Sequence, residues 1–395
     1  MNTHNNRYAK WKQRELVLIL LYAIAFYAYV VWRSLRLSHD HYFKLHGLAS
    51  GWLIPNRRND VSDAQWRNFR GNLPILSFVF AVFTVIANGV RSFFHLRAKG
   101  MAILWLSMSL IYLIYLHGAC VIYILSIATA NFLLVKLDMP QNTLSFKDVA
   151  WYGVRWLFSF LLIELMTHLF YYNAFVISGL WRELSPVEIF IVGYGVLNFM
   201  WLKFLLLWRY FRFWSLVNGI ETVENMPNCI NNCYSLELFW KTWHASFNRW
   251  LIRYMYIPLG GSRRKFLNVW VVFTFVAMWH DLEWKLLSWA WLTCLFFMPE
   301  MLLKSASSAY KVESAFGEFL LRELKALSGA VTITCLMIAN LAGYVIGPSG
   351  INWMVSSFLK REGVPVLGGV FFSLYVGTKL MFHIQDLRSV AHSPK

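Results

Sequence analysis

The sequence has 395 residues, of which 58% are apolar and only 14% are charged, whereas ordinary soluble domains carry about 25% charged residues. A soluble globule of this composition would expose apolar patches that aggregate, so the composition excludes a soluble protein and predicts a bundle of helices in lipid. The net charge is +17, but the basic residues mostly lie between apolar runs, where they suit contact with anionic lipid, and no nucleic-acid partner is expected.

The N-terminal apolar runs predict the first membrane spans. A helix needs about 20 apolar residues to cross about 30 Å of hydrocarbon. The runs 16–32 and 73–90 approach this length, and the polar residues 33–72 between them predict an extramembrane loop. The run 101–135 is too long for one crossing, so we expect two spans with a break at Gly118.

Two long apolar runs follow, at 149–178 and 187–214. The second is preceded by Ser185 and Pro186, which predict an N-cap and a first helical residue. The remaining predicted spans are 266–280, 284–303, 329–346 and 364–382. The expected fold class is therefore all-α, a polytopic transmembrane helix bundle of about ten spans.

Two further segments are too polar to cross in contact with lipid. Residues 236–261 mix aromatic rings with charged groups, which predicts an interfacial or re-entrant helix facing a cavity. Residues 310–327 are amphipathic and are expected on the membrane surface. The predicted organisation is an N-terminal transmembrane region at 1–135 and a core at 149–395, and the core contains a signature block at 236–303.

Glu164 and His168 interrupt one apolar run and are four residues apart, so they share a helix face. They can face a cavity or form a structural hydrogen bond between helices, and the second interpretation is favoured.

Two histidines carry most of the chemical information. His280 closes an apolar run, and its imidazole can act as a general base near neutral pH. The alternative is an interfacial histidine beside tryptophan with a satisfied hydrogen bond. His244 lies far from it in sequence, and no cysteine or carboxylate stands at metal-ligand spacing around either one, so no metal site is expected.

The residues around these histidines resemble a known family. Residues 239–261 read F-W-K-T-W-H-A-S-F-N-R-W-L-I-R-Y-M-Y-I-P-L-G-G, and a later apolar run ends in W-H-D at 279–281. Together they resemble the signature of the membrane-bound O-acyltransferases. The residues up to Glu300, and D-V-S-D-A-Q-W-R-N-F-R at 60–70, look closest to the branch that contains glycerol-uptake (Gup) proteins and hedgehog acyltransferase.

The resemblance implies an acyltransferase of the endoplasmic reticulum membrane. Its acyl donor would be acyl-CoA, a co-substrate, with no cofactor, and its acceptor a hydroxyl or amine on a lipid, a GPI-anchor intermediate or a protein. The invariant histidine of the family falls on His280, and its second active-site position falls on His244. The acyl chain would lie in an apolar tunnel, where each buried CH2 contributes about 0.8 kcal/mol.

The same resemblance suggests substrate-binding residues in the two motifs. These are Asn248, Arg249, Arg253, Trp279 and Asp281. The arginines, with Arg263, Arg264 and Lys265, can meet the phosphates of CoA, and ordinary contact with lipid headgroups is the alternative for each.

One departure from the family pattern leaves two alternatives open. Members of this branch usually carry additional spans before the signature block, whereas residues 136–147 lead almost directly into Val149. A shortened, catalytically impaired regulatory isoform is therefore one alternative. The other is a transporter for a small polyol such as glycerol, with Glu164, His168 and His244 along its path, although no inverted repeat is visible.

Overall fold

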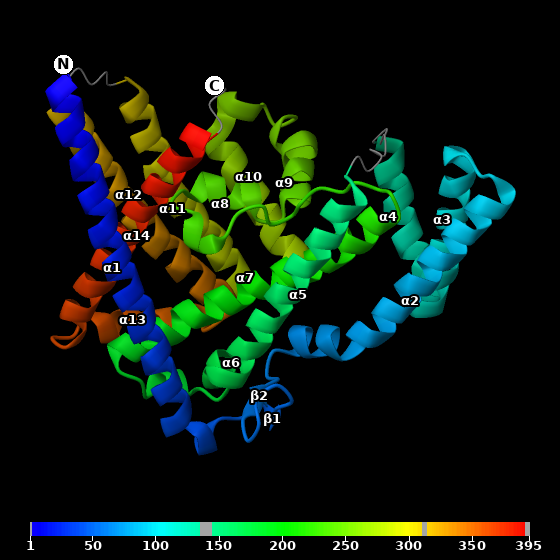
Figure 1. The fold of residues 1–395 in the computed structure, drawn as a ribbon, viewed down its shortest axis with the longest axis horizontal. Helices are drawn as coiled ribbons and strands as arrows, with labels where there is room; N and C mark the ends of the chain where they lie inside the picture. Colours follow the sequence, from blue (N-terminus) through cyan, green and yellow to red (C-terminus); the bar gives the residue numbers. More distant parts are fainter. Residues whose placement is uncertain (1, 135–143, 310–313, 392–395) are drawn as a thin grey trace. The chain divides into compact units, whose positions relative to one another are not determined.

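The computed structural model describes residues 2–134, 144–309 and 314–391, and these form helices almost throughout (Figure 1). The chain divides into two compact units. Unit 1 comprises Met1–Asp63, Ser159–Leu205 and Glu224–Lys395, and unit 2 comprises Ala64–Phe158 and Leu206–Val223. The predicted all-α class is confirmed, while the predicted division at residues 135–149 stays a prediction. Most of the segment 136–147 lies outside the described residues.

Seven helices within the described ranges are long and apolar enough to cross a membrane. Their bounds are Trp11–Asp40, Ala64–Phe94, Ala98–Ser126, Phe146–Leu169, Pro186–Val217, Phe316–Tyr344 and Gly363–Ser389. The chain is therefore a multi-pass membrane protein, but the expected number of about ten spans is wrong.

Unit 2 consists of aromatic-rich helices. They are α2 (Ala64–Phe94), α3 (Ala98–His117), α4 (Val121–Leu134), the first half of α5 (Phe146–Leu169) and the end of α7 (Pro186–Val217). The ring of Phe80 stacks on Trp214 with centroids 5.7 Å apart, and Ser77 shares a 2.9 Å hydrogen bond with Tyr210. These contacts fix α2 against the end of α7.

The predicted break at Gly118 is confirmed, but within the described residues it does not produce two full spans. Gly118 has φ +53° and ψ −131°, a conformation that side chains with a Cβ rarely adopt, and it ends α3. The 14 residues of α4 rise about 21 Å, which is too short to cross about 30 Å of hydrocarbon. The run 101–135 therefore supplies one candidate span.

Unit 1 holds the larger core. It contains the hairpin β1 (Leu48–Ser50) and β2 (Arg58–Asp60), and the helices α1 (Asn2–Asp40), α6 (Tyr172–Ile177), α12 (Ala315–Tyr344), α13 (Gly347–Leu359) and α14 (Gly363–Ala391). Buried side chains such as Leu37, Phe175, Ile191 and Leu341 join α1, α6, α7 and α12 in one cluster. The sequence analysis did not predict α13.

The predicted surface helix at 310–327 is wrong where the structure describes it. Residues 310–313 lie outside the described part, and the rest belongs to α12, which continues unbroken to Tyr344. Two of its charged side chains have partners on α14: Arg322 bonds Asp386 at 3.0 Å and Glu323 bonds Lys379 at 2.6 Å, whereas Glu318 and Lys325 are exposed. Paired in this way, Arg322 and Glu323 can pack against α14.

Two other predicted spans, 266–280 and 284–303, are not among the seven candidates. Helix α10 (Lys265–His280) has 16 residues and rises only about 24 Å. Helix α11 (Trp284–Ala309) carries Lys285, Glu300 and Lys304. Both helices nevertheless pack together in unit 1, and α11 also packs on α12.

Candidate active site

The segment predicted as one interfacial or re-entrant helix is a series of short pieces. Helix α8 (Leu236–Thr242) and helix α9 (Ala245–Leu251) have seven residues each, and a π-helical turn, Ile252–Tyr256, follows. Helices this short are not stable alone, so contacts from other parts of unit 1 must hold them.

Glu300 of α11 holds the start of α8. Its carboxylate accepts hydrogen bonds from the Leu236 N–H at 2.6 Å and from the Ser235 hydroxyl at 2.5 Å. Lys304, one turn further along α11, is 2.8 Å from the same carboxylate and 2.9 Å from Glu237. A negative charge at a helix N-terminus is stabilising, and this one ties the signature block to α11.

Asn225 holds the turn between α8 and α9. His244 occupies this turn with φ +48°, in the left-handed region that few residues other than glycine enter. The Ala245 N–H donates to the Asn225 carbonyl at 3.2 Å, and the Ser246 N–H donates to Asn225 Oδ1 at 2.9 Å. Two of the free N–H groups at the start of α9 are therefore satisfied by Asn225, which holds the turn at His244.

The start of α10 is set by a glycine turn. Gly260 has φ +104° and Gly261 has φ +55°, as expected for glycines that serve backbone geometry. The buried side chain of Asn268 donates to the Gly261 carbonyl at 2.9 Å, so the turn is locked onto α10. The other end of α10 carries Trp279 and His280.

Trp279 lies near both histidines. Its ring centroid is 6.3 Å from that of His244 and 4.9 Å from that of His280. It also stacks on Phe247 of α9 at 4.4 Å, so α9 and the end of α10 meet at this ring. His244 and Trp279, 35 positions apart in sequence, are thus brought to one place.

His280 is exposed on one side and surrounded by rings on the other. The centroids of Trp289 and Tyr344 lie 5.9 Å and 5.7 Å from its own. Trp289 is almost fully buried, packs on Trp240 of α8 at 5.6 Å, and donates through Nε1 to Asn340 of α12 at 3.3 Å. An enclosed cavity around both histidines stays a prediction.

The surroundings lower the pKa of both imidazoles. Burial is the main cause for His244, with a smaller contribution from the nearby His280, and its pKa falls to about 4. Burial also lowers the pKa of His280 below its usual value. Both histidines are therefore neutral at pH 7, the form that accepts a proton.

The predicted substrate-binding residues fall into two groups. Trp279 and Asn248 belong to the site: Asn248 lies in the first turn of α9, where its N–H donates to the His244 carbonyl at 3.0 Å. Arg249, Arg253 and Asp281 are exposed. Arg263 and Arg264 are exposed as well. None of these placements tests a role in binding substrate.

The sequence analysis missed Asn225, Glu300 and Tyr344 as parts of this site. Glu300 could have been recognised from the sequence, because it is a carboxylate within an apolar run. Asn225 could not, because it stands in a polar loop where such residues are common.

Glu164 and His168 lie elsewhere in unit 1. Both are fully buried, and they hold the loop that joins β1 and β2: Trp52 Nε1 donates to Glu164 Oε2 at 2.7 Å, and the Trp52 N–H donates to His168 Nε2 at 3.2 Å. The structural interpretation fits these contacts, although they join a helix to a loop rather than two helices.

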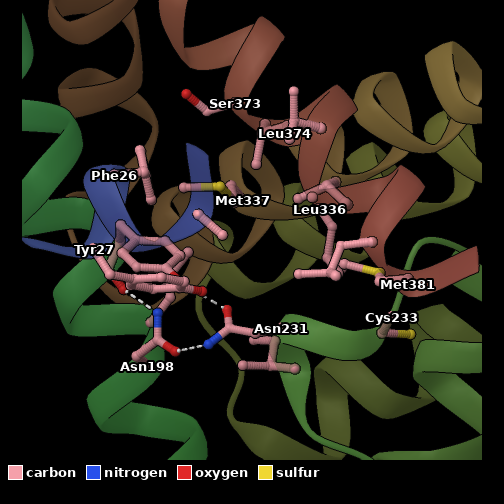
Figure 2. A pocket seen from close by; sticks show the side chains of 18 of the residues that line it. Phe26, Tyr27, Asn198, Asn231, Cys233, Leu336, Met337, Ser373, Leu374 and Met381 are labelled. Atoms are coloured by element: carbon pink, nitrogen blue, oxygen red, sulfur yellow. Dashed lines mark hydrogen bonds between the residues drawn. The ribbon is translucent and has the colours of Figure 1, made fainter. Parts of the chain in front are cut away.

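A largely apolar cavity of about 140 Å³ lies among α1, α7, α12 and α14. Figure 2 shows Phe26, Leu336, Met337 and Met381 along it, with Asn198 and Asn231 hydrogen-bonded to each other at one side. Asn340 lines this cavity and accepts a hydrogen bond from Trp289, whose ring packs on His280. The cavity is therefore connected to His280 through Asn340 and Trp289.

The fold and this site define a multi-pass helical membrane protein with two neighbouring neutral histidines. The model of the membrane-bound O-acyltransferase family matches residues 132–339, which is more than half of the chain. The chain therefore belongs to the membrane-bound O-acyltransferase family, and the resemblance of its two motifs is confirmed.

Individual relatives agree with the Gup-like branch. The chain is 38% identical to the membrane-bound O-acyltransferase gup1 of Schizosaccharomyces pombe over 269 residues, 66% of this chain and 44% of that protein. It is 36% identical to GUP1 of Saccharomyces cerevisiae over 261 residues, 66% of this chain and 46% of that protein. The mouse protein-cysteine N-palmitoyltransferase HHAT is 31% identical over 139 residues, 34% of this chain and 28% of that protein. The matched region spans less than half of each relative.

Proposed function

We propose that this chain transfers a fatty acyl group from acyl-CoA to a hydroxyl, or an amine, of a lipid, GPI-anchor intermediate or protein in the endoplasmic reticulum membrane. The observation that carries the proposal is the meeting of His244 and His280 at Trp279 in a member of the membrane-bound O-acyltransferase family. The names of the Gup relatives and of the N-palmitoyltransferase HHAT support the same class of reaction.

In the proposed reaction His280 acts as the general base. Its neutral imidazole takes the proton of the acceptor hydroxyl while the oxygen attacks the thioester carbonyl carbon. The carbon–sulfur bond breaks, the acyl group passes to the acceptor oxygen, and the proton goes to the leaving thiolate of CoA. In this proposal His244, which also lies near Trp279, orients the acceptor. Because a thioester is already activated, alignment and desolvation supply most of the remaining rate enhancement.

The apolar cavity of Figure 2 supports a place for the acyl chain. Its wall is mostly hydrocarbon, and it approaches His280 through Asn340 and Trp289. A fatty chain gains about 0.8 kcal/mol for each CH2 that leaves water. For the CoA phosphates, the exposed Arg249, Arg253, Arg263 and Arg264 remain the candidates.

The test is acyl transfer by the purified full chain in lipid nanodiscs. Labelled palmitoyl-CoA is incubated with a panel of lipid, glycolipid and peptide acceptors, with wild type beside His280→Ala. Product formation by wild type and not by the variant, at equal expression and thermal stability, supports the proposal. Wild-type levels of transfer by His280→Ala would refute the role given to this residue.

A further inference from the structure

A second cavity, of about 180 Å³, lies in unit 1 between α6 and α7 and beside the end of α12. An ion pair forms part of its wall: Lys203 Nζ is 2.8 Å from Asp63 Oδ2. The Lys203 side chain is 8% exposed and that of Asp63 is 23% exposed. Asn173 and Tyr344 add two more polar groups, and Val196 and Phe199 are among the apolar ones.

The position of this ion pair is costly. Lys203 lies in the middle of α7, a candidate membrane span, where charged side chains are expensive and usually mark a functional path or site. A buried ion pair is seldom more stabilising than apolar side chains of the same volume. Cavities with polar walls hold water or a ligand, whereas those that stay dry are apolar. A role in binding a ligand therefore explains the Lys203–Asp63 ion pair better than a contribution to the stability of the fold does.

The cavity lies near the candidate active site, although neither histidine lines it. Tyr344 lines the cavity, and its ring centroid is 5.7 Å from that of His280. Lys203 Nζ lies 5.2 Å from the ring of Phe204, whose centroid is 5.8 Å from that of Trp243, the residue before His244. One ring therefore separates the cavity from His280, and a short chain of rings leads to His244.

We infer that this cavity binds the headgroup of the acyl acceptor, and that the headgroup is an uncharged polyol. The ammonium of Lys203 donates to a hydroxyl oxygen, and the carboxylate of Asp63 accepts from a neighbouring hydroxyl. The wall carries one charge of each sign, so an anion would meet Asp63 and a cation would meet Lys203. The inference rests on the proposed function only in that the bound hydroxyl is the one presented to His280.

The test measures binding to the full chain in nanodiscs. The probe is a photoreactive monoacylglycerol, with cross-linked peptides mapped by mass spectrometry and with competition by 1-monooleoylglycerol or by methyl oleate, which has the same chain and no hydroxyl. We expect labelling of α6 or α7 that 1-monooleoylglycerol abolishes and methyl oleate does not.

A matched pair of variants separates binding from folding. Lys203→Met/Asp63→Asn removes both charges together, so no uncompensated charge is left buried. We expect it to weaken competition by 1-monooleoylglycerol about tenfold or more, because hydrogen bonds to charged groups are lost. The control, Arg33→Met/Glu188→Gln, neutralises another partly buried pair of unit 1 and should leave competition unchanged.

Other results would overturn the inference. Equal competition by methyl oleate, stronger competition by anionic oleoyl-glycerol phosphate, or unchanged binding in the Lys203→Met/Asp63→Asn variant would each do so. Binding should persist in His280→Ala, because that residue does not hold the headgroup. Intact binding without acyl transfer therefore contradicts the proposed function alone, and transfer without headgroup binding contradicts this inference alone.

Discussion

The helices α2 and α3 of unit 2 and the signature block of unit 1 are specified in different ways. In the candidate spans Ala64–Phe94 and Ala98–Ser126 only 6% of the most apolar window is buried, and apolar length alone predicts them. In the signature block α8 and α9 have seven residues each and depend on Glu300 and Asn225. Hydropathy therefore locates the spans, while hydrogen bonds and ring contacts from distant residues build the site.

The largest expected effect follows from removing the two histidines of the candidate site. His280→Ala should lower the rate of acyl transfer by about 10²–10⁴-fold, as the loss of a general base typically does. His244→Ala should lower it as well, and the double variant should be little worse than the more damaging single one, because groups that act as a unit are not additive. Single-turnover transfer from labelled palmitoyl-CoA measures this. Phe78→Leu, at an exposed position of α2, is the control. If the rate loss of the double variant equals the product of the two single losses, the two histidines act independently and do not form one site.

Glu300, which holds the start of α8, should contribute more to the free energy of unfolding than the exposed Lys241–Glu237 ion pair nearby. Glu300→Ala leaves the Leu236 N–H and the Ser235 hydroxyl without their acceptor, which should lower the free energy of unfolding by about 2–3 kcal/mol. Lys241→Ala removes only an exposed pair with Glu237 and should cost under about 1 kcal/mol. Thermal unfolding in detergent compares the two, and equal costs would show that Glu300 is not an anchor.

Unit 2 offers its own matched pair of glycines. Gly118→Ala should destabilise the turn between α3 and α4 by about 1–3 kcal/mol, because Gly118 holds a conformation that alanine rarely adopts. Gly89→Ala lies within α2, where a Cβ meets nothing within 4 Å, and should be neutral or stabilising by up to about 1 kcal/mol. Hydrogen exchange of unit 2 peptides reports both changes. Faster hydrogen exchange in the Gly89→Ala variant and not in the Gly118→Ala variant would contradict this prediction.

The smallest expected effect is on the pH dependence of stability. His244 has a pKa of about 4 in the folded chain against 6.5 ordinarily, so between these values the unfolded state binds the proton and the folded state does not. Protonation of His244 in the unfolded state should therefore lower the stability as the pH falls, by under about 1 kcal/mol between pH 7 and 6. His244→Gln should flatten the slope in thermal unfolding scans. An unchanged slope would mean that His244 is not held in its neutral form.

Part of the fold follows from local sequence alone. The start of α7 is one example: the Ser185 hydroxyl and N–H both donate to Glu188, at 2.7 Å and 2.8 Å, and Pro186 is the first helical residue as predicted. Gly118 ends α3 for an equally local reason. Signals of this kind act over a few residues and can be recognised without the fold.

The site could not be predicted in the same way, because its supports are remote in sequence. Glu300 reaches back 64 residues to Leu236, and Asn225 reaches forward 21 residues to Ser246. Residues 310–327 were predicted as a helix on the membrane surface, because the partners of Arg322 and Glu323 on α14 cannot be recognised from local sequence. The association of His244 with His280 came from the family resemblance, and no spacing rule would have supplied it.

The most direct test of this account is whether residues 244 and 280 meet in the membrane. In a chain whose five native cysteines are replaced, cysteines at these two positions are treated with a short bifunctional maleimide, and the chain is cut between them. The account predicts that the two fragments stay joined. The control is a chain with cysteines at 225 and 246, cut between these two positions, whose fragments should also stay joined because Asn225 and Ser246 are hydrogen-bonded at 2.9 Å. Separation of the 244/280 fragments while the control pair remains joined would contradict it.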